Sequence, residues 1–328
     1  KYRLYLSGIK HSDKKTWLAA LKNIRYYEIS RNFANFLPIP TKDINDYVNE
    51  LNESGKSLSY MRQNLKAVSD FYIWLEKQKG YRNKINLDNI EMFSLTTNQY
   101  KTASATEYKE SYKIEDILRV IRSMPDKTYI DQRNKAIISL QALCGLRIGE
   151  LRTVKIKNLK FDNISNNWFV YVFPKNMSVK FAKTRQAYFM PLDDDIKENV
   201  LRWLNKLREL GWTDEAPLFP SLYDNFGQSD LLQTVNMPCE IKSNTTIIKL
   251  FKDTFTGAGL PYYRPHSFRD TIAIWAELNG SPAFFNAVSQ SLGHSSPKTT
   301  FSIYGKLPPA RIGEIMKNNP AGSPHVAL

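Results

Sequence analysis

Hydrophobic residues recur every three to four positions over most of residues 1–92, which is the spacing of one face of a helix. The pattern predicts helices over residues 12–33, 41–51 and 57–79, and Gly80 then stands where glycine commonly ends a helix. The apolar stripe of the third helix consists of Met61, Leu65, Val68, Phe71 and Leu75. We expect residues 1–92 to form a helical domain in which Phe71, Tyr72 and Trp74 belong to the core rather than to a base-stacking surface.

The helical period is lost over residues 93–111, where Thr, Ser, Asn and Lys predominate, so this stretch is predicted to be an interdomain linker. Helices resume after it, over residues 114–124, 133–151, 194–210, 245–259 and 267–280. Between the second and third of these, NNWFVYVF and RQAYFMPL alternate with a period of two and predict strands of a small antiparallel sheet. Residues 221–243 are predicted to form a long loop. The predicted fold class is therefore mainly α with a small antiparallel sheet (α+β).

Length and composition support two folded domains. A chain of 328 residues exceeds the roughly 250–300 residues over which a single core usually extends. Apolar residues make up 42% of the chain and charged residues 24%, which is ordinary for a globular protein. We therefore expect a first domain at residues 1–92, the linker at 93–111 and a second domain at 112–328.

The net charge of +14 predicts a polyanionic partner, of which nucleic acid is the commonest, although solubilising surface charge is the alternative. Cys144 and Cys239 are too few for a disulfide framework or a thiolate zinc site, which favours a reducing compartment. No apolar run approaches a membrane span, and the first residues lack the pattern of a signal peptide, so we expect a cytoplasmic, DNA-associated protein. The chain begins at Lys1 rather than Met, as a piece of a longer or processed chain would.

Four short motifs in the second domain contain side chains suited to chemistry: CGLRIGEL, AKTRQAYFMPL, RPHSFRD and LGHSSPKTTFSIYG. The residues in question are Arg147, Lys183, His266, Arg269, His294 and Tyr304. Arginines offer two-pronged hydrogen bonds to phosphate, imidazoles transfer protons near neutral pH, and a lysine can act as an acid. Together these groups could catalyse phosphoryl transfer.

Each motif also has an ordinary structural explanation. Arg147 can pair with Glu150, three residues further along the same helical side. Lys183 can be a solvated lysine of a hairpin, and the H-x-x-R motif opens a predicted helix, where capping explains part of its polarity. His294 and Tyr304 can pack in a core. Taken one at a time, these explanations are the commoner ones.

Metal-dependent alternatives have little support in the sequence. It contains no glycine-rich phosphate loop, no His-Glu-x-x-His motif and no carboxylate cluster suited to two magnesium ions. Asp270 and the run 193–195 are the nearest candidates, and the run is better interpreted as negative charge at a helix N-terminus. Protein cations must then stabilise the charge of the transition state, and no metal or other cofactor is expected.

In this order, the motifs resemble those of the tyrosine recombinase (phage integrase) family. The resemblance assigns Arg147 and Glu150 to the family's G-L-R-[IL]-x-E-L box, and CGLRIGEL departs from it only modestly, with Cys144 where a residue such as Thr is usual. It assigns His266 and Arg269 to H-x-x-R, His294 to L-G-H and Tyr304 to the nucleophile. The hairpin lysine is Lys175, Lys180 or Lys183, and Lys183 is preferred because it stands eight residues before Pro191, as in the family.

The resemblance implies a two-domain C-shaped clamp around duplex DNA, with a core-binding domain at 1–92 and a catalytic domain with a C-terminal tail at 112–328. It implies that Tyr304 attacks a phosphodiester to give a 3′-phosphotyrosyl link and a free 5′-hydroxyl. Arg147, Arg269 and His294 would stabilise the pentavalent state. Lys183 would protonate the leaving oxygen and His266 would assist Tyr304, a poor nucleophile at pH 7 with its ordinary pKa of about 10.

The expected partners are double-stranded recombination sites, with four protomers on two sites, a monomer or weak oligomer without DNA, and possible accessory DNA-bending proteins. The tail, with Ile312 and Ile315, would dock on a neighbouring protomer or pack against its own protomer. Three alternatives remain: a DNA-binding regulator without activity, the same chemistry without strand exchange (a type IB topoisomerase or telomere resolvase), and a metal-dependent nuclease using His266, Asp270 and His294.

Overall fold

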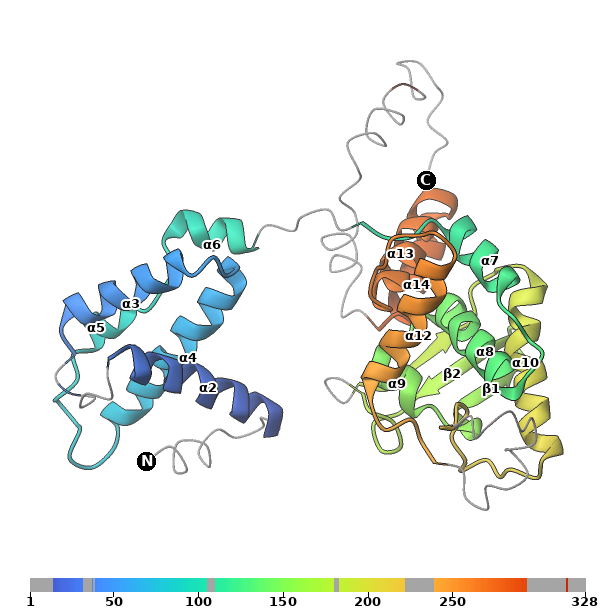
Figure 1. Cartoon of the computed structure of the whole chain (residues 1–328), viewed down its shortest axis with the longest axis horizontal. Coiled ribbons are helices and arrows are strands. Elements are labelled where there is room, and N and C mark those ends of the chain that lie inside the picture. Colours follow the sequence, from blue (N-terminus) through green and yellow to red (C-terminus); the bar gives the residue numbers. More distant parts are fainter. Residues whose placement is uncertain are drawn as a thin grey trace. The chain divides into compact units, whose positions relative to one another are not determined.

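The computed structural model describes residues 14–31, 37, 39–104, 110–179, 183–221, 239–293 and 317. The chain divides into two compact units, Lys1–Ala105 and Thr106–Leu328 (Figure 1). In the described ranges no helix is both long enough and apolar enough to cross a membrane.

The first unit is helical. Its described helices are α2 (Lys14–Ser30), α3 (Thr41–Glu53), α4 (Leu58–Glu76), α5 (Leu87–Glu91) and α6 (Thr97–Ser104). Helix α4 contacts all the others and contributes its predicted stripe to the core (Figure 1). Phe71 and Tyr72 are buried there, as predicted, and Trp74 packs against the core from its edge.

The structure differs from the sequence prediction in the stretch 93–111, because α6 lies inside it and belongs to the first unit. Thr96 and Gln99 form a reciprocal cap at its start: the backbone N–H of Thr96 donates to Oε1 of Gln99 at 3.1 Å, and the backbone N–H of Gln99 donates to Oγ1 of Thr96 at 3.3 Å. The ring of Tyr100 then lies 4.5 Å from the guanidinium carbon of Arg62 on α4. These contacts order a polar segment that has little apolar periodicity.

The second unit combines helices with one small sheet, and the predicted fold class is confirmed. Its described elements are α7 (Ile114–Ser123), α8 (Tyr129–Cys144), α9 (Ile148–Thr153), the 3₁₀ turn η1 (Ile156–Asn158), β1 (Leu159–Asp162), β2 (Asn167–Val172), β3 (Arg185–Tyr188), α10 (Asp194–Glu209), α12 (Asn244–Gly257), α13 (Ser267–Asn279) and α14 (Pro282–Ser291). Helix α8 contacts α7, α10, α13 and β3 (Figure 1). Every residue from Ala136 to Cys144 is buried.

The sheet is antiparallel in the order β1-β2-β3. Leu159 pairs with Val170, which pairs with Ala187, and these three side chains are buried on the face turned to the core. Residues on one face of a strand recur with a period of two, so Arg185 lies on the same buried face as Ala187. The sequence pattern predicted β2 and β3, but not β1.

The predicted single helix over 133–151 is wrong, because Gly145 ends α8. Its φ of 53° lies in the left-handed region that glycine adopts without strain. A Cβ at this position would lie 2.7 Å from Cδ2 of Leu292 and 3.3 Å from Cγ of Arg269. The turn therefore needs glycine for its backbone conformation and for the close approach of Arg269 on α13 and of Leu292 after α14.

The two ends of the predicted loop 221–243 lie together, since the backbone N–H of Ser221 donates to the carbonyl of Cys239 at 2.7 Å. Residues 222–238 between them lie outside the described residues. At the start of α10, Asp193, Asp194 and Asp195 supply the negative charge expected at a helix N-terminus. Arg122 of α7 bonds Asp193 and Asp195, and thereby ties α7 to α10.

Candidate active site

Arg147 stands at the N-cap of α9, directly after the glycine turn. Its backbone N–H donates to Oε2 of Glu150 at 2.8 Å, and its Nη1 donates to Oε1 at 3.1 Å. The predicted pairing with Glu150 is therefore present, but as a cap of a new helix rather than along one helix. The side chain of Arg147 remains 21% exposed, so it is not sealed inside the protein as Glu150 is.

Arg269, in the first turn of α13, is almost completely buried, with 1% of its surface exposed. Its Nη1 donates to the carbonyl of Gly145 at 2.5 Å and its Nη2 to the carbonyl of Leu292 at 2.6 Å. One side chain thus joins the turn before Arg147 to the segment before His294. Arg269 has a structural role that the motif alone did not indicate.

The side chain of Gln141 on α8 connects the segments that carry Arg147 and His266. The sequence pattern did not indicate this residue. Its side chain is completely buried, and its Nε2 donates to the carbonyls of Leu146 at 2.9 Å and Pro265 at 3.0 Å. These carbonyls belong to the residues that directly precede Arg147 and His266. A buried amide inside an otherwise apolar helix was the signal that could have identified it.

His266 stands at the N-cap position of α13, where its side chain makes no capping hydrogen bond, and is exposed. The loop before it is held by Tyr112, whose hydroxyl accepts from the backbone N–H of Tyr263 at 2.8 Å. The carbonyl of Tyr112 in turn accepts from Oγ1 of Thr271 at 2.8 Å. Burial raises the pKa of Tyr112 to about 12, so this hydroxyl stays protonated at neutral pH. The first residues of the second unit are therefore anchored on the segment that carries His266.

Lys183 is exposed and lies two residues before Arg185 of β3. The connection from β2 is anchored on α9, because the backbone N–H of Ser178 donates to Oγ1 of Thr153 at 2.8 Å. A Cβ at Gly149 would lie 3.0 Å from the carbonyl oxygen of Ser178, so α9 and this connection are in close contact. Lys175 is also exposed, and Lys180 lies outside the described residues.

Arg185 is a second residue that the sequence analysis missed. Its Nη1 and Nη2 donate to Glu150 at 2.8 and 2.7 Å, and its Nε donates to the carbonyl of Ser291 at 3.0 Å. Burial acts to raise the pKa of Glu150, but the hydrogen bonds and charge of Arg185, followed by those of Arg147, hold it below its ordinary value. Glu150 is therefore an ionised, completely buried carboxylate.

Four of the segments predicted to carry chemistry therefore meet: the turn 145–150, the start of β3, the start of α13 and the segment 291–293. Arg147, Lys183, His266, Arg269 and Glu150 lie on the first three of these segments. His294 and Tyr304, like Ile312 and Ile315 of the tail, lie outside the described residues. His294 follows Gly293 directly, and the backbone just before it is bonded by both Arg185 and Arg269.

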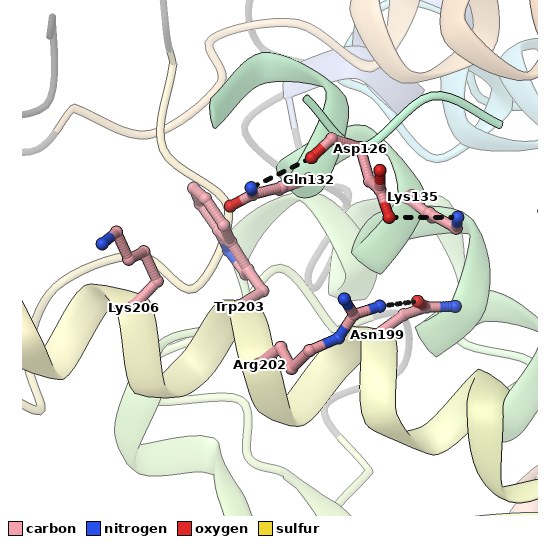
Figure 2. A pocket seen from close by; sticks show the side chains of 7 residues that line it. All are labelled: Asp126, Gln132, Lys135, Asn199, Arg202, Trp203 and Lys206. Atoms are coloured by element: carbon pink, nitrogen blue, oxygen red, sulfur yellow. Dashed lines mark hydrogen bonds and ion pairs between the residues drawn. The ribbon is translucent and has the colours of Figure 1, made fainter. Parts of the chain in front are cut away.

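A separate pocket of about 230 Å³ lies between the start of α8 and α10 (Figure 2). Its lining residues are Asp126, Gln132, Lys135, Asn199, Arg202, Trp203 and Lys206. None of the predicted site residues lines it. Within the described part of the chain, no group of three His, Cys, Asp or Glu side chains is arranged to hold a metal ion.

Comparison with known proteins gives the family. The model of the phage integrase family matches residues 110–311, which contain all the motifs described above. The chain belongs to the phage integrase family. As one of these tyrosine recombinases, it is a site-specific DNA recombinase. The site described above lies wholly inside the family-matching region.

Curated relatives are similar over nearly the whole chain. Tyrosine recombinase XerC of Lactobacillus delbrueckii subsp. bulgaricus is 25% identical over 305 residues, which cover 90% of this chain and 90% of the relative. The integrase of Staphylococcus phage L54a is 21% identical over 331 residues, covering 93% of this chain and 85% of that protein. The similarity of this recombinase to its relatives therefore includes the first helical unit.

Solved recombinase structures share the fold. XerH bound to its palindromic difH substrate, in a post-cleavage complex, matches with a TM-score of 0.65 and 18% identity, covering 93% of this chain and 80% of that chain. A lambda integrase tetramer bound to a Holliday junction matches with a TM-score of 0.59 and 18% identity, covering 94% and 77%. At this identity the likeness supports the tyrosine recombinase fold and nothing finer.

Proposed function

We propose that this recombinase integrates or excises a mobile DNA element by cleaving and rejoining DNA through a 3′-phosphotyrosyl link on Tyr304. The observation that carries the proposal is that buried side chains join four segments by hydrogen bonds: the turn 145–150, the start of β3, the start of α13 and the backbone before His294. Residues from four distant stretches of the sequence are thereby held around one place, as a multi-residue phosphoryl-transfer site needs.

Arg147 is assigned the first contact with the non-bridging oxygens of the phosphate, because its side chain is partly exposed. Arg269 is the second proposed phosphate ligand. In this structure two of its five N–H groups donate to backbone carbonyls, which holds Leu292 in place, and its positive charge acts on the phosphate. His294 is proposed to add a hydrogen bond to the same phosphate.

Proton transfer is assigned to Lys183 and His266. Both side chains are exposed, which suits groups that must reach bound DNA. Lys183 donates a proton to the leaving 5′-oxygen, and His266 assists removal of the proton from Tyr304. The bond energy is conserved in the phosphotyrosyl link, so the proposed reaction requires neither ATP nor a metal ion.

The proposed partner is duplex DNA, bound as four protomers on two sites. A net charge of +14 favours binding to a polyanion, and lambda integrase forms a tetramer on a Holliday junction. The similarity to a phage integrase is the reason for preferring a mobile element to a chromosomal site as the substrate. Accessory DNA-bending proteins belong to the same proposal.

The test is to form the covalent intermediate. A recombination site is first recovered by selecting random duplexes on the purified protein, and a nick is then placed beside each candidate cleavage position. The labelled duplex is incubated with protein in EDTA and analysed under denaturing conditions. We expect a protein–DNA adduct with the wild type and none with Tyr304→Phe. In a second assay, the wild type should exchange strands between two intact sites.

Each result has a distinct meaning. An adduct that persists in Tyr304→Phe assigns the nucleophile elsewhere. An adduct without strand exchange supports the topoisomerase or resolvase alternative. Cleavage that disappears in EDTA supports the metal-dependent nuclease, and tight binding without any adduct supports the inactive regulator.

A further inference from the structure

Glu150 occupies an unusual position between two arginines. Its carboxylate is completely buried and accepts four hydrogen bonds: two from Arg147, at 2.8 and 3.1 Å, and two from Arg185, at 2.8 and 2.7 Å. Four bonds match the acceptor capacity of an ionised carboxylate. One negative charge is therefore shared by two positive ones.

The two arginines use this carboxylate differently. Arg185 donates with both terminal nitrogens in a planar two-pronged pair, and only 6% of its side chain is exposed. Arg147 makes a single side-chain bond at 3.1 Å, and 21% of its side chain is exposed. Because Arg185 neutralises the buried carboxylate, the positive charge of Arg147 is not needed to balance it.

Arg185 also holds the backbone that leads to His294. Its Nε donates to the carbonyl of Ser291, and the backbone N–H of Tyr188 on the same strand donates to Oγ of Ser291 at 3.0 Å. The side chain passes so close to Gly293 that a Cβ there would lie 2.6 Å from Cδ of Arg185. A single guanidinium therefore fixes both the partner of Arg147 and the segment before His294.

We propose that Arg185 is a positioning residue of the recombination site, which neutralises Glu150 so that Arg147 keeps its charge for the scissile phosphate. The inference rests on the proposed function, because it needs Arg147 to bind that phosphate. Without Arg185, Glu150 draws Arg147 into a closed two-pronged pair, and the phosphate loses its ligand. A purely structural Arg185 would instead stabilise the fold without controlling Arg147.

The charged groups around Glu150 allow a pH test. Among the described residues, Arg147 faces it from α9 and Arg185 from β3. The Cys144 thiol of α8 interacts with Arg185, but burial raises its pKa, so it stays neutral. With Arg185 removed, burial raises the pKa of Glu150 and only Arg147 opposes this. When the carboxyl group is protonated on acidification, Arg147 is released.

The experiment compares Arg185→Met, Glu150→Gln/Arg185→Met and the wild type in single-turnover cleavage of the nicked duplex between pH 5.5 and 8, with DNA affinity and folding measured for each. At pH 7.5 we expect Arg185→Met to cleave about 100-fold more slowly than the wild type, the size of effect seen when one transition-state donor is lost. The double variant, which has no carboxylate to capture Arg147, should be at least about tenfold faster than Arg185→Met.

The decisive quantity is the rate of Arg185→Met divided by that of the double variant, since both lack Arg185 and differ only in the titrating carboxyl group. We expect this ratio to rise as the pH falls. A ratio independent of pH, or a double variant no faster than Arg185→Met when both are folded, overturns the inference and leaves Arg185 structural.

Arg122→Met is the matched control, because Arg122 pairs with Asp193 and Asp195 at the start of α10 and with none of the site residues that the structure describes. Its cleavage rate should equal that of the wild type, and an equal loss in both arginine variants would count against a specific role for Arg185. Failure of the wild type to form any adduct refutes the proposed function instead. A wild-type adduct together with wild-type rates in Arg185→Met refutes only this inference.

Discussion

Nε2 of Gln141 lies 3.0 Å from the carbonyl oxygen of Pro265, which links the last turn of α8 to the residue before His266, 124 positions away in the sequence. The same nitrogen donates to Leu146, the residue before Arg147. The relative position of these two candidate residues therefore depends on one buried amide.

We predict that Gln141→Leu weakens both stability and activity. The change removes the donor of the buried carbonyl of Leu146, at a cost of about 1–3 kcal/mol, whereas the carbonyl of Pro265 keeps a 3.3 Å bond from the backbone N–H of Phe268. Urea unfolding should show this loss in the second unit, and cleavage should fall about 10- to 100-fold at temperatures where the variant is folded. Gln132→Leu on the same helix is the control, since Gln132 donates to an exposed carbonyl. Similar losses in both variants would contradict the prediction.

Gly293→Ala should be more harmful than its backbone conformation alone explains. Gly293 and Gly211 both have positive φ, 75° and 77°, but only Gly293 has atoms in the way of a Cβ, which would lie 2.6 Å from Cδ of Arg185. Gly211→Ala should therefore lose about 1–2 kcal/mol of unfolding free energy, and Gly293→Ala more, with slower cleavage in addition. Equal losses measured by urea unfolding would show that Arg185 moves aside without consequence.

Glu277→Gln should stabilise the second unit at neutral pH. Oε2 of Glu277 is buried without a hydrogen-bond partner among the described residues, and burial raises the pKa of this carboxyl group. A raised pKa in the fold means that ionisation opposes folding, so wild-type stability falls as the pH rises from the ordinary value, about 4.5, through the folded one. The gain in Glu277→Gln should therefore be larger at pH 7 than at pH 4, where the carboxyl group is largely protonated in both the folded and the unfolded chain.

Thermal unfolding at several pH values measures this gain. Glu198→Gln, an exposed carboxylate on α10, is the control for the loss of one negative charge. A gain of the same size at pH 4 and pH 7, or the same gain in the control, would mean that burial of Glu277 has no energetic effect.

Leu65→Ala should unfold the first unit without weakening the second. Leu65 is 1% exposed in a core made only of residues from the first unit. Removal of a buried leucine side chain costs about 2–5 kcal/mol. Calorimetry should show one transition shifted down and the other unchanged, with cleavage of pre-bound substrate as a second readout. A single transition that shifts as a whole would contradict two independent cores.

The sequence predicted most helices because the apolar residues of each helix lie on the face that is turned to a core. The elements that were not predicted include β1, α6 and α14. β1 has only four residues, too few for a period of two to be recognised. α6 is polar, and the cap at Thr96 and Gln99 was its only strong signal. α14 was missed although Ser281 and Pro282 form a typical helix start.

The residues of the candidate site were predicted from their motifs, but the hydrogen bonds that join their segments were not. Arg147, His266 and Arg269 were identified by residue type and spacing, and the structure brings their segments together. Arg185 and Gln141 were missed because each contacts residues far away in the sequence, which no local pattern encodes. A charged residue on the buried face of a strand was the available hint for Arg185, since Ala187 on the same face is completely buried.

The hydrogen bond between Ser221 and Cys239 has a consequence for engineering this recombinase. It holds together the two residues that flank the stretch 222–238. Each doubling of such a connection adds only about 0.6 kcal/mol of closure entropy. A fluorescent reporter or an additional DNA-binding module inserted between these two residues should therefore leave the catalytic unit folded, which offers a way to redirect the enzyme without changing its site.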